Sequence, residues 1–162
     1  MCIYTYMFLL RVTTALRKAR VPYGLVGGYA VALHGAVRGT LDVDLVIRLE
    51  EAHFVLAERA LKSIGLAPRL PVTAKEVYRF REEYIRNRSL HAWSFVNPAV
   101  PSELVDVVLT QDLARLSTVA MRVQGKQIRV VAVDDLIAIK QAAGRPQDLE
   151  DVRALRALKE KR

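Results

Sequence analysis

The sequence lacks most of the patterns that identify common enzyme classes. It has no G-x-G-x-x-G segment and no lysine following its one glycine pair, which excludes dinucleotide-binding folds and P-loop NTPases. It has no G-x-S-x-G segment, and a single cysteine with three scattered histidines makes a poor nucleophile system. Metal-ligand spacings of the zinc type are missing as well. Another kind of chemistry must therefore be sought in the residues that are present.

Cysteines and long apolar runs are also scarce. The only cysteine, Cys2, excludes an internal disulfide and fits a reducing cytosol, so we expect a cytoplasmic protein. The N-terminal apolar run is short, has no basic residue ahead of it and is interrupted by Arg11. It therefore fails as a signal peptide and as a membrane span, and we expect no membrane association.

The overall composition is that of a globular protein with a strong positive charge. A length of 162 residues suits one domain with a substantial core, and 52% of the residues are hydrophobic while 26% are charged. The net charge of +8 favours acidic partners such as nucleotides or RNA.

Residues 23–47 form the stretch around which the chain is organised. The apolar run from Leu41 to Ile47 predicts a strand interrupted only by Asp42 and Asp44. Side chains two apart on a strand point the same way, with Cα atoms about 6.5–7 Å apart. The two carboxylates can therefore ligate one hard cation, and oxygen-only ligation suits Mg²⁺ or Mn²⁺. The alternative is a pair of solvated aspartates at the end of a strand.

A glycine pair precedes this strand. Gly27 and Gly28 follow the short apolar run Tyr23 to Val26, and a small-residue helix is expected from about Tyr29 to His34. Glycines between a strand and a helix let the backbone come close to a ligand, and a helix N-terminus suits phosphate. A phosphate cradle followed by a carboxylate pair predicts a site for a metal-bound nucleoside triphosphate.

These residues resemble those of a known superfamily. Gly27-Gly28, thirteen intervening residues and Asp42-Val43-Asp44 are similar to the signature of the DNA polymerase β-type nucleotidyltransferases. The R-x-T-x-D-x-D spacing of Arg38, Thr40, Asp42 and Asp44 looks most like the AbiEii-type members, which include toxins of phage-defence and toxin–antitoxin systems. The resemblance extends from about Val21 to the C-terminus.

The resemblance implies a fold and a set of site residues. The fold is α/β (α+β), with a small mixed β-sheet flanked by helices. Asp106, in the segment ELVDVVL, is in the setting of the family's third carboxylate, so the catalytic and metal-binding residues would be Asp42, Asp44 and Asp106. Nucleotide-binding roles fall to Gly27, Gly28, Arg38, Thr40, Lys140 and Arg145. For Lys140 a structural ion pair is an equal alternative, and for Asp148 and Asp151 the structural role is favoured.

The remaining elements can be placed by their periodicity and their turn residues. A core-packing helix is expected to end near Arg20, and Thr73-x-x-Glu76 predicts a capping box for a helix reaching about Asn87. Strands at 91–96 and 103–109 can pair, and a lone buried Asp106 would be costly to ionise without a cation. We expect one domain, consisting of the N-terminal helix (1–20), a catalytic core (23–109), and a hairpin with C-terminal helices (119–160). In the last part, Asp134 or Asp135 is expected to cap a helix over 136–143, and Leu149, Val152 and Leu155 are expected to mark the buried face of the final one.

The expected reaction is transfer of a nucleoside monophosphate from an NTP such as ATP to a hydroxyl, with Mg²⁺ or Mn²⁺ as cofactor. The acceptor can be RNA (including tRNA), a protein or a small molecule, and a cognate antitoxin or other partner protein is a further possibility. Two rival hypotheses use the same residues. One is a module that binds nucleotide or partner without turnover, and the other is a metal-dependent phosphohydrolase.

Overall fold

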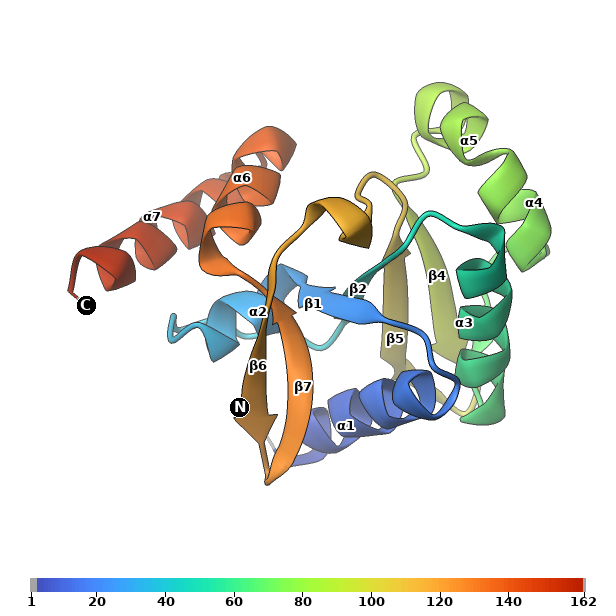
Figure 1. The fold of residues 1–162 in the computed structure, drawn as a ribbon, viewed down its shortest axis with the longest axis horizontal. Helices are drawn as coiled ribbons and strands as arrows, with labels where there is room; N and C mark the ends of the chain where they lie inside the picture. The colour runs from blue at the N-terminus through green and yellow to red at the C-terminus, as the bar shows by residue number, and fades with distance from the viewer. Residues whose placement is uncertain (1–2, 162) are drawn as a thin grey trace.

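A seven-stranded mixed sheet forms the centre of the molecule (Figure 1). The computed structural model describes residues 3–161, so Cys2 lies outside the described residues. The strands follow one another across the sheet in the order β3-β4-β5-β2-β1-β7-β6. Their bounds are β1 Tyr23–Val26, β2 Val43–Ile47, β3 Ala67–Pro68, β4 Ala92–Asn97, β5 Val100–Val108, β6 Thr118–Val123 and β7 Lys126–Val131.

The middle of the sheet is the most deeply buried part. Strand β2 pairs antiparallel with β1 and parallel with β5, and β1 pairs parallel with β7. All four residues of β1 are buried, as are four of the five in β2, the half-buried Asp44 being the exception. The α/β fold with a small mixed sheet flanked by helices is therefore confirmed.

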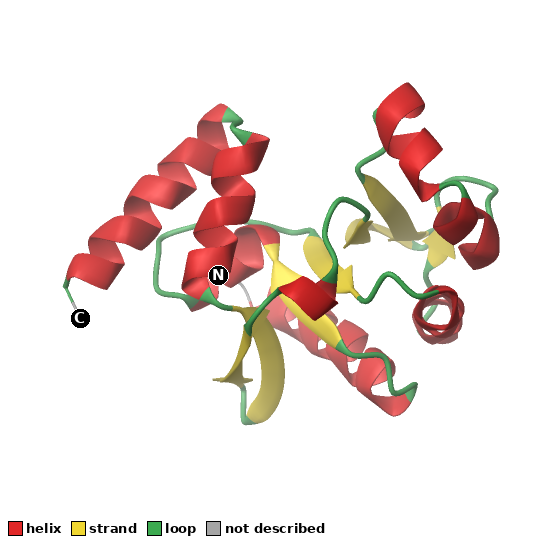
Figure 2. Ribbon diagram, turned by 45° about the horizontal axis from the view of Figure 1, so that its top comes forward, coloured by secondary structure: helices red, strands yellow, loops and turns green. Residues whose placement is uncertain are grey.

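Helices and one 3-10 turn surround this sheet. Figure 2 shows the pair α6 and α7 at one end of the molecule, with α4 and α5 at the other. Their bounds are α1 Ile3–Lys18, α2 Gly27–Leu33, α3 Glu51–Ser63, α4 Ala74–Arg79, α5 Arg81–Arg88, the 3-10 turn η1 Leu113–Arg115, α6 Val133–Ala143 and α7 Pro146–Glu160. No helix within residues 3–161 is long and apolar enough to cross a membrane.

Helix α1 ends in a left-handed residue that is not glycine. Val21 N–H donates to the Leu16 carbonyl at 3.0 Å and Arg20 N–H to the Arg17 carbonyl at 3.1 Å. Together they form a Schellman-type ending in which Arg20, with φ of +56°, occupies the position that glycine usually takes. The predicted end of this helix near Arg20 is confirmed.

The helix predicted from Thr73 to about Asn87 is in fact two helices. The capping box is present: Thr73 Oγ1 accepts the Glu76 N–H, and the Glu76 carboxylate accepts the Thr73 N–H. The first helix ends at Arg79, Phe80 has a non-helical backbone, and α5 begins at Arg81. Arg81 donates to the Leu109 carbonyl at 2.8 Å, which ties the start of α5 to the end of β5.

Two predictions for the C-terminal helices are wrong in detail. Ala132 is the N-cap of α6, because Asp135 accepts the Ser117 N–H instead and Asp134 pairs with Lys159. Leu149 is 42% exposed. The buried face of α7 consists of Asp148, Asp151, Val152 and Leu155. Asp148 and Asp151, and not Leu149, are buried on this face because the buried Lys140 pairs with both carboxylates.

Candidate active site

The pairing of β2 with β5 brings two of the predicted acids together. Asp44 and Asp106 are register partners on these adjacent parallel strands, so they lie side by side on one face of the sheet. Asp42 is exposed and comes directly before β2, two residues before Asp44. Asp44 and Asp106 are half-buried at the same place. Segments about sixty residues apart in the sequence thus supply the carboxylates of one site.

The charges of the three acids interact. Burial first, and then the charges of Asp106 and Asp42, raise the pKa of Asp44 to about 7, against the opposing effect of Lys140 and Arg145. Burial and the charge of Asp106 also raise the pKa of Asp42. Clustered carboxylates whose ionisation is this unfavourable would gain from a nearby cation.

Ser94 is a member of the site that the sequence reasoning missed. It faces Asp106 across the antiparallel pair β4–β5, and its Oγ donates to Asp106 Oδ1 at 2.5 Å. The only signal in the sequence was a lone hydroxyl in the apolar segment AWSFV, and its partner depends on the β4–β5 register, which the sequence did not give. The hydrogen bond fixes the orientation of the Asp106 carboxylate.

The three carboxylates have the chemistry that a divalent cation requires, but their side chains are not positioned to bind one cation together. Within the described part of the chain, no group of three or more His, Cys, Asp or Glu side chains is arranged to hold a metal ion. One oxygen of Asp106 accepts from Ser94, and Asp42 is exposed, so side-chain rotation would be needed to bring all three together. The donor set itself consists of carboxylate oxygen atoms, which suit Mg²⁺ or Mn²⁺, and the pKa values of Asp42 and Asp44 are raised. A cation held here would be ligated by Asp42, Asp44 and Asp106.

The glycine pair packs directly on this site. Gly27 has a φ of +67°, and a Cβ atom added to it would lie 1.9 Å from Asp44 Oδ2. A Cβ atom on Gly28 would lie 2.7 Å from Thr40 Cβ. The backbone therefore passes over Asp44 and Thr40 at a distance that only glycine permits. This places Gly27, Gly28 and Thr40 beside the carboxylates.

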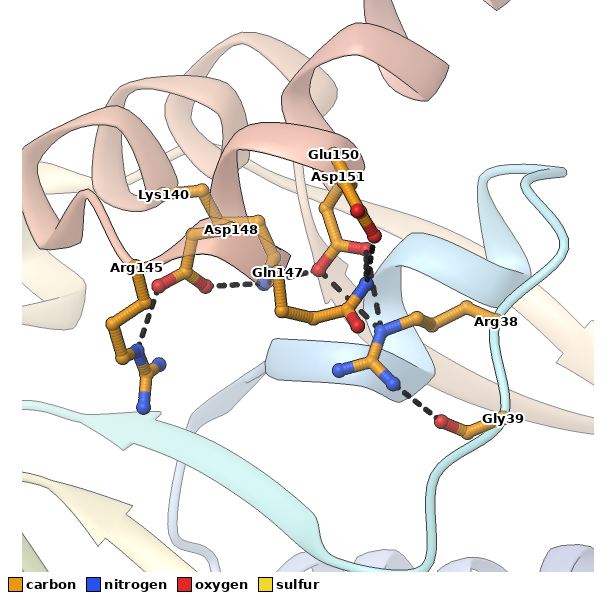
Figure 3. A network of polar contacts seen from close by, with 8 residues as sticks. All are labelled: Arg38, Gly39, Lys140, Arg145, Gln147, Asp148, Glu150 and Asp151. Carbon is orange, nitrogen blue, oxygen red and sulfur yellow. Dashed lines mark hydrogen bonds and ion pairs between the residues drawn. The ribbon is translucent and has the colours of Figure 1, made fainter.

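Figure 3 shows a network of basic and acidic side chains that joins α6, α7 and the segment after α2. The Nζ of Lys140 contacts Asp148 at 3.0 Å and Asp151 at 2.8 Å, and all three side chains are at least 93% buried. Arg145 Nε contacts Asp148 at 2.7 Å, and Arg38 Nε contacts Asp151 at 3.2 Å. Burial acts to raise the pKa of Asp148, but the bonds from Arg145 and Lys140 outweigh it, so that pKa lies below its usual range.

The predicted nucleotide-binding cations thus lie near the site but have protein partners. Lys140 and Arg145 are close enough to Asp44 to lower its pKa. Lys140 is enclosed between two carboxylates, whereas the Arg145 side chain is 78% exposed beside the site. Arg38 pairs with Asp151 and also donates to the Gly39 carbonyl at 2.5 Å. All residues proposed from the sequence therefore lie around one region, and Lys140, Arg38 and Arg145 each form an ion pair with Asp148 or Asp151.

Several solved structures share this fold at low sequence identity. The antibiotic-resistance factor ANT(2'')-Ia matches with a TM-score of 0.65 and 14% identity, over 96% of this chain and 84% of that one. The lincosamide antibiotic adenylyltransferase LnuA, solved with lincomycin bound, matches with a TM-score of 0.61 and 12% identity, over 98% of both chains. A putative nucleotidyltransferase from Thermotoga maritima matches with a TM-score of 0.61 and 16% identity, over all of this chain and 97% of its own.

The sequence itself identifies the family. No curated protein is detectably similar in sequence to this chain. A family model described as "Nucleotidyltransferase of unknown function (DUF6036)" matches residues 9–160, which is nearly the whole chain and includes every site residue named above. The AbiEii-like subtype is a narrower assignment than this match supports. The chain belongs to the DUF6036 family of nucleotidyltransferases.

Proposed function

We propose that this nucleotidyltransferase uses a divalent cation to transfer a nucleoside monophosphate from ATP or another NTP to a hydroxyl, releasing pyrophosphate. The observation that carries the proposal is the register pairing of Asp44 with Asp106, with Asp42 close enough for its charge to act on Asp44. Asp42 and Asp44 both have raised pKa values, and within residues 3–161 no basic side chain forms an ion pair with either of them. A cation-dependent site accounts for this arrangement.

The carboxylates have distinct parts in this mechanism. A bound Mg²⁺ or Mn²⁺ ion would neutralise the triphosphate charge and activate the acceptor hydroxyl. Asp42 and Asp44 would hold the cation for the nucleotide, and Asp106, which the hydrogen bond from Ser94 orients, would hold it for the acceptor.

The remaining site residues position the triphosphate. The backbone at Gly27 and Gly28 can approach the phosphates because no side chain intervenes, as its contact with Asp44 illustrates. Arg145 is exposed beside Asp44 and can place its guanidinium on a phosphate, while Lys140 supplies positive charge from within the network. Arg38 and Thr40 hold the segment that leads into β2. Stabilising charge on the transferring phosphoryl group is the main task of such an enzyme.

The proposed function has two versions, which differ in the acceptor of the nucleoside monophosphate. LnuA is a lincosamide antibiotic adenylyltransferase, and the antibiotic-resistance factor ANT(2'')-Ia was solved in complex with adenylyl-2''-tobramycin, which supports a small-molecule acceptor. The AbiEii-like R-x-T-x-D-x-D spacing supports instead a toxin that modifies a cellular RNA or protein, with a cognate antitoxin as partner. Both versions require the same carboxylates and the same NTP chemistry.

Incubation with each α-labelled NTP, Mg²⁺ or Mn²⁺, and separate pools of RNA, protein and aminoglycosides tests the proposal. Labelled acceptor is the expected result. Label released as nucleoside mono- or diphosphate without transfer would indicate a phosphohydrolase, and binding without turnover would indicate an idle module.

The double substitution Asp42→Asn with Asp44→Asn is expected to abolish transfer while the circular dichroism spectrum stays native. Retained transfer in that variant refutes the assignment.

A further inference from the structure

A hollow lined by four arginines lies apart from the carboxylates. Arg17 and Arg20 come from the end of α1, Arg48 follows β2, and Arg129 lies on β7. The hollow has a volume of about 680 Å³. All four arginines are exposed. No acidic side chain of the described residues lines the hollow.

The four guanidinium groups are available to a ligand. Within residues 3–161, none of them takes part in an ion pair or a side-chain hydrogen bond, whereas Arg11, Arg38, Arg79 and Arg145 all do. The nearby Asp112 accepts backbone N–H groups from Leu49 and Ala114, so its carboxylate is already engaged. Four unpaired guanidinium groups around one hollow repel each other, and an anion with several negative oxygens would relieve that repulsion.

Arg20 gives an independent indication that this surface has a use. Its φ of +56° places it at the left-handed position that ends α1, where glycine is the favoured residue. An arginine there is less stable than a glycine would be. Residues kept in such conformations concentrate at functional sites.

The hollow lies within reach of the carboxylate site. Leu113 lines the hollow and packs over Gly24, where an added Cβ would lie 3.1 Å from Leu113 Cδ1. Gly24 is two residues before Val26, the register partner of Asp44. That separation is about 7 Å along a strand, and Arg48, which lines the hollow, lies four residues beyond Asp44, about 13 Å along the strand. A flexible chain of phosphates crossing the 3-10 turn η1 can therefore occupy the hollow while its end lies over Asp44.

We propose that the arginine hollow binds the phosphate backbone of a single-stranded RNA, which is the acceptor class of the nucleotidyl transfer. This inference rests on the proposed function for the identity of the reaction, but the binding itself does not require turnover. Guanidinium forks suit phosphate oxygens, and a backbone with a phosphate on every nucleotide can engage several of them at once. The hollow holds the RNA, and the hydroxyl at its end meets the nucleotide at Asp44 and Asp106.

Fluorescence anisotropy with a labelled RNA of about 12 nucleotides tests the binding without NTP or metal. Engagement of about four phosphates predicts that log K falls with log salt concentration at a slope of about −3. Arg48→Ala with Arg129→Ala should weaken binding at least tenfold and make the slope shallower by about 1.4. The matched control is Arg153→Ala with Arg156→Ala, which removes from α7 two exposed arginines that form no ion pair within residues 3–161 and should leave affinity within about twofold. Equal losses in both double variants would mean that only net charge matters, and would overturn the proposal.

Arg20→Gly distinguishes lost binding from lost folding. We expect this variant to have a higher denaturation midpoint than the wild type and several-fold weaker RNA binding. Unchanged affinity would overturn the role of Arg20. Poly-glutamate or free tripolyphosphate that competes as well as RNA, through the same arginines, would also overturn the proposal in favour of an acidic protein or a free nucleotide.

The Asp42→Asn, Asp44→Asn variant separates this inference from the proposed function. It should bind RNA at least as tightly as the wild type while transferring no label. If RNA binding is absent but the wild type labels another acceptor, the arginine hollow has a different ligand and the proposed function stands. If RNA binds through the hollow and no NTP is turned over, the hollow is an RNA-binding site and the proposed function is wrong.

Discussion

Asp44 lies half-buried between two other carboxylates, in surroundings that oppose its ionisation. Its pKa of about 7 exceeds the ordinary value of 3.8 because of burial first and the charges of Asp106 and Asp42 second. The folded protein therefore holds a proton at Asp44 that the unfolded chain releases at lower pH. The stability contributed by this raised pKa is present below about pH 4 and is lost as the pH rises to about 7.

We predict that the free energy of unfolding of the metal-free protein falls between about pH 4 and 7 by up to about 4 kcal/mol through this one group. Asp44→Asn should remove that fall and be the more stable protein at pH 7. Urea denaturation across this pH range measures the difference in the free energy of unfolding between the two proteins. The contributions of the other acidic residues are common to both proteins and cancel in that difference. A constant difference across the range would show that Asp44 has an ordinary pKa.

Gly27 is the other residue whose identity the site dictates. An added Cβ would overlap Asp44 Oδ2, and the φ of +67° already disfavours any side chain. We predict that Gly27→Ala lowers stability by about 2–4 kcal/mol, combining backbone strain with overpacking. Nucleotidyl transfer should be lost with it, because Asp44 must move. The control is Gly65→Ala, which has a φ of +90° but no atom within 4 Å of the added Cβ, and should cost only about 1 kcal/mol. Equal costs at the two positions would show that the contact with Asp44 is unimportant.

Sequence reasoning reached these residues because each breaks a local rule. Two aspartates in an apolar strand and a glycine pair between a strand and a helix are visible without coordinates. Ser94 was missed because a single serine in a strand is ordinary, and its meaning depends on which residue lies opposite. That partner is set by the β4–β5 register, which shifts between Val96 and Asn97 and is not encoded in local pattern.

At the scale of elements, the association of α6 with α7 depends on buried charge. Lys140 on α6 contacts Asp148 and Asp151 on α7, and Arg38, which follows α2, joins the same network. The spacing of Lys140, Arg145, Asp148 and Asp151 suggested such pairing, with phosphate binding as the alternative. The sequence could not show that Asp148 and Asp151 would displace Leu149 from the buried face of α7, because carboxylates are buried only where a counter-charge meets them.

We predict that Lys140→Ala lowers stability by about 3–5 kcal/mol, because two buried carboxylates would then lack their shared cation. The matched comparison is Arg79→Ala, which breaks a pair with Glu51 in which the side chains are 62% and 34% exposed, and should cost no more than about 1 kcal/mol. Urea denaturation of both variants at pH 7 measures the costs. A loss below about 1 kcal/mol for Lys140→Ala would mean that its charge serves the nucleotide alone.

At the scale of the whole molecule, the strands were easier to predict than their neighbours in space. Apolar runs and turn residues located all but one strand, the two-residue β3 being too short to leave a pattern. The sheet order is a different matter, because β2 pairs with β5 across more than fifty residues and β1 with β7 across about a hundred. The resemblance to known nucleotidyltransferases supplied only the expectation that Asp106 would meet Asp42 and Asp44, and not the order of the strands. The arginine hollow had no signal at all, since its four side chains come from α1, the end of β2 and β7.

The carboxylates and the fold are linked through a cation, and this link gives a last prediction. If Mg²⁺ or Mn²⁺ binds Asp42, Asp44 and Asp106 only in the folded protein, a concentration 100 times the dissociation constant should stabilise it by about 2.7 kcal/mol. The effect should be larger at pH 8 than at pH 5, because protons compete for Asp44 below its pKa of about 7. Thermal denaturation with and without the metal, at constant ionic strength, measures it. The Asp42→Asn, Asp44→Asn variant is the control, and an equal shift in that variant would place the cation elsewhere on the molecule.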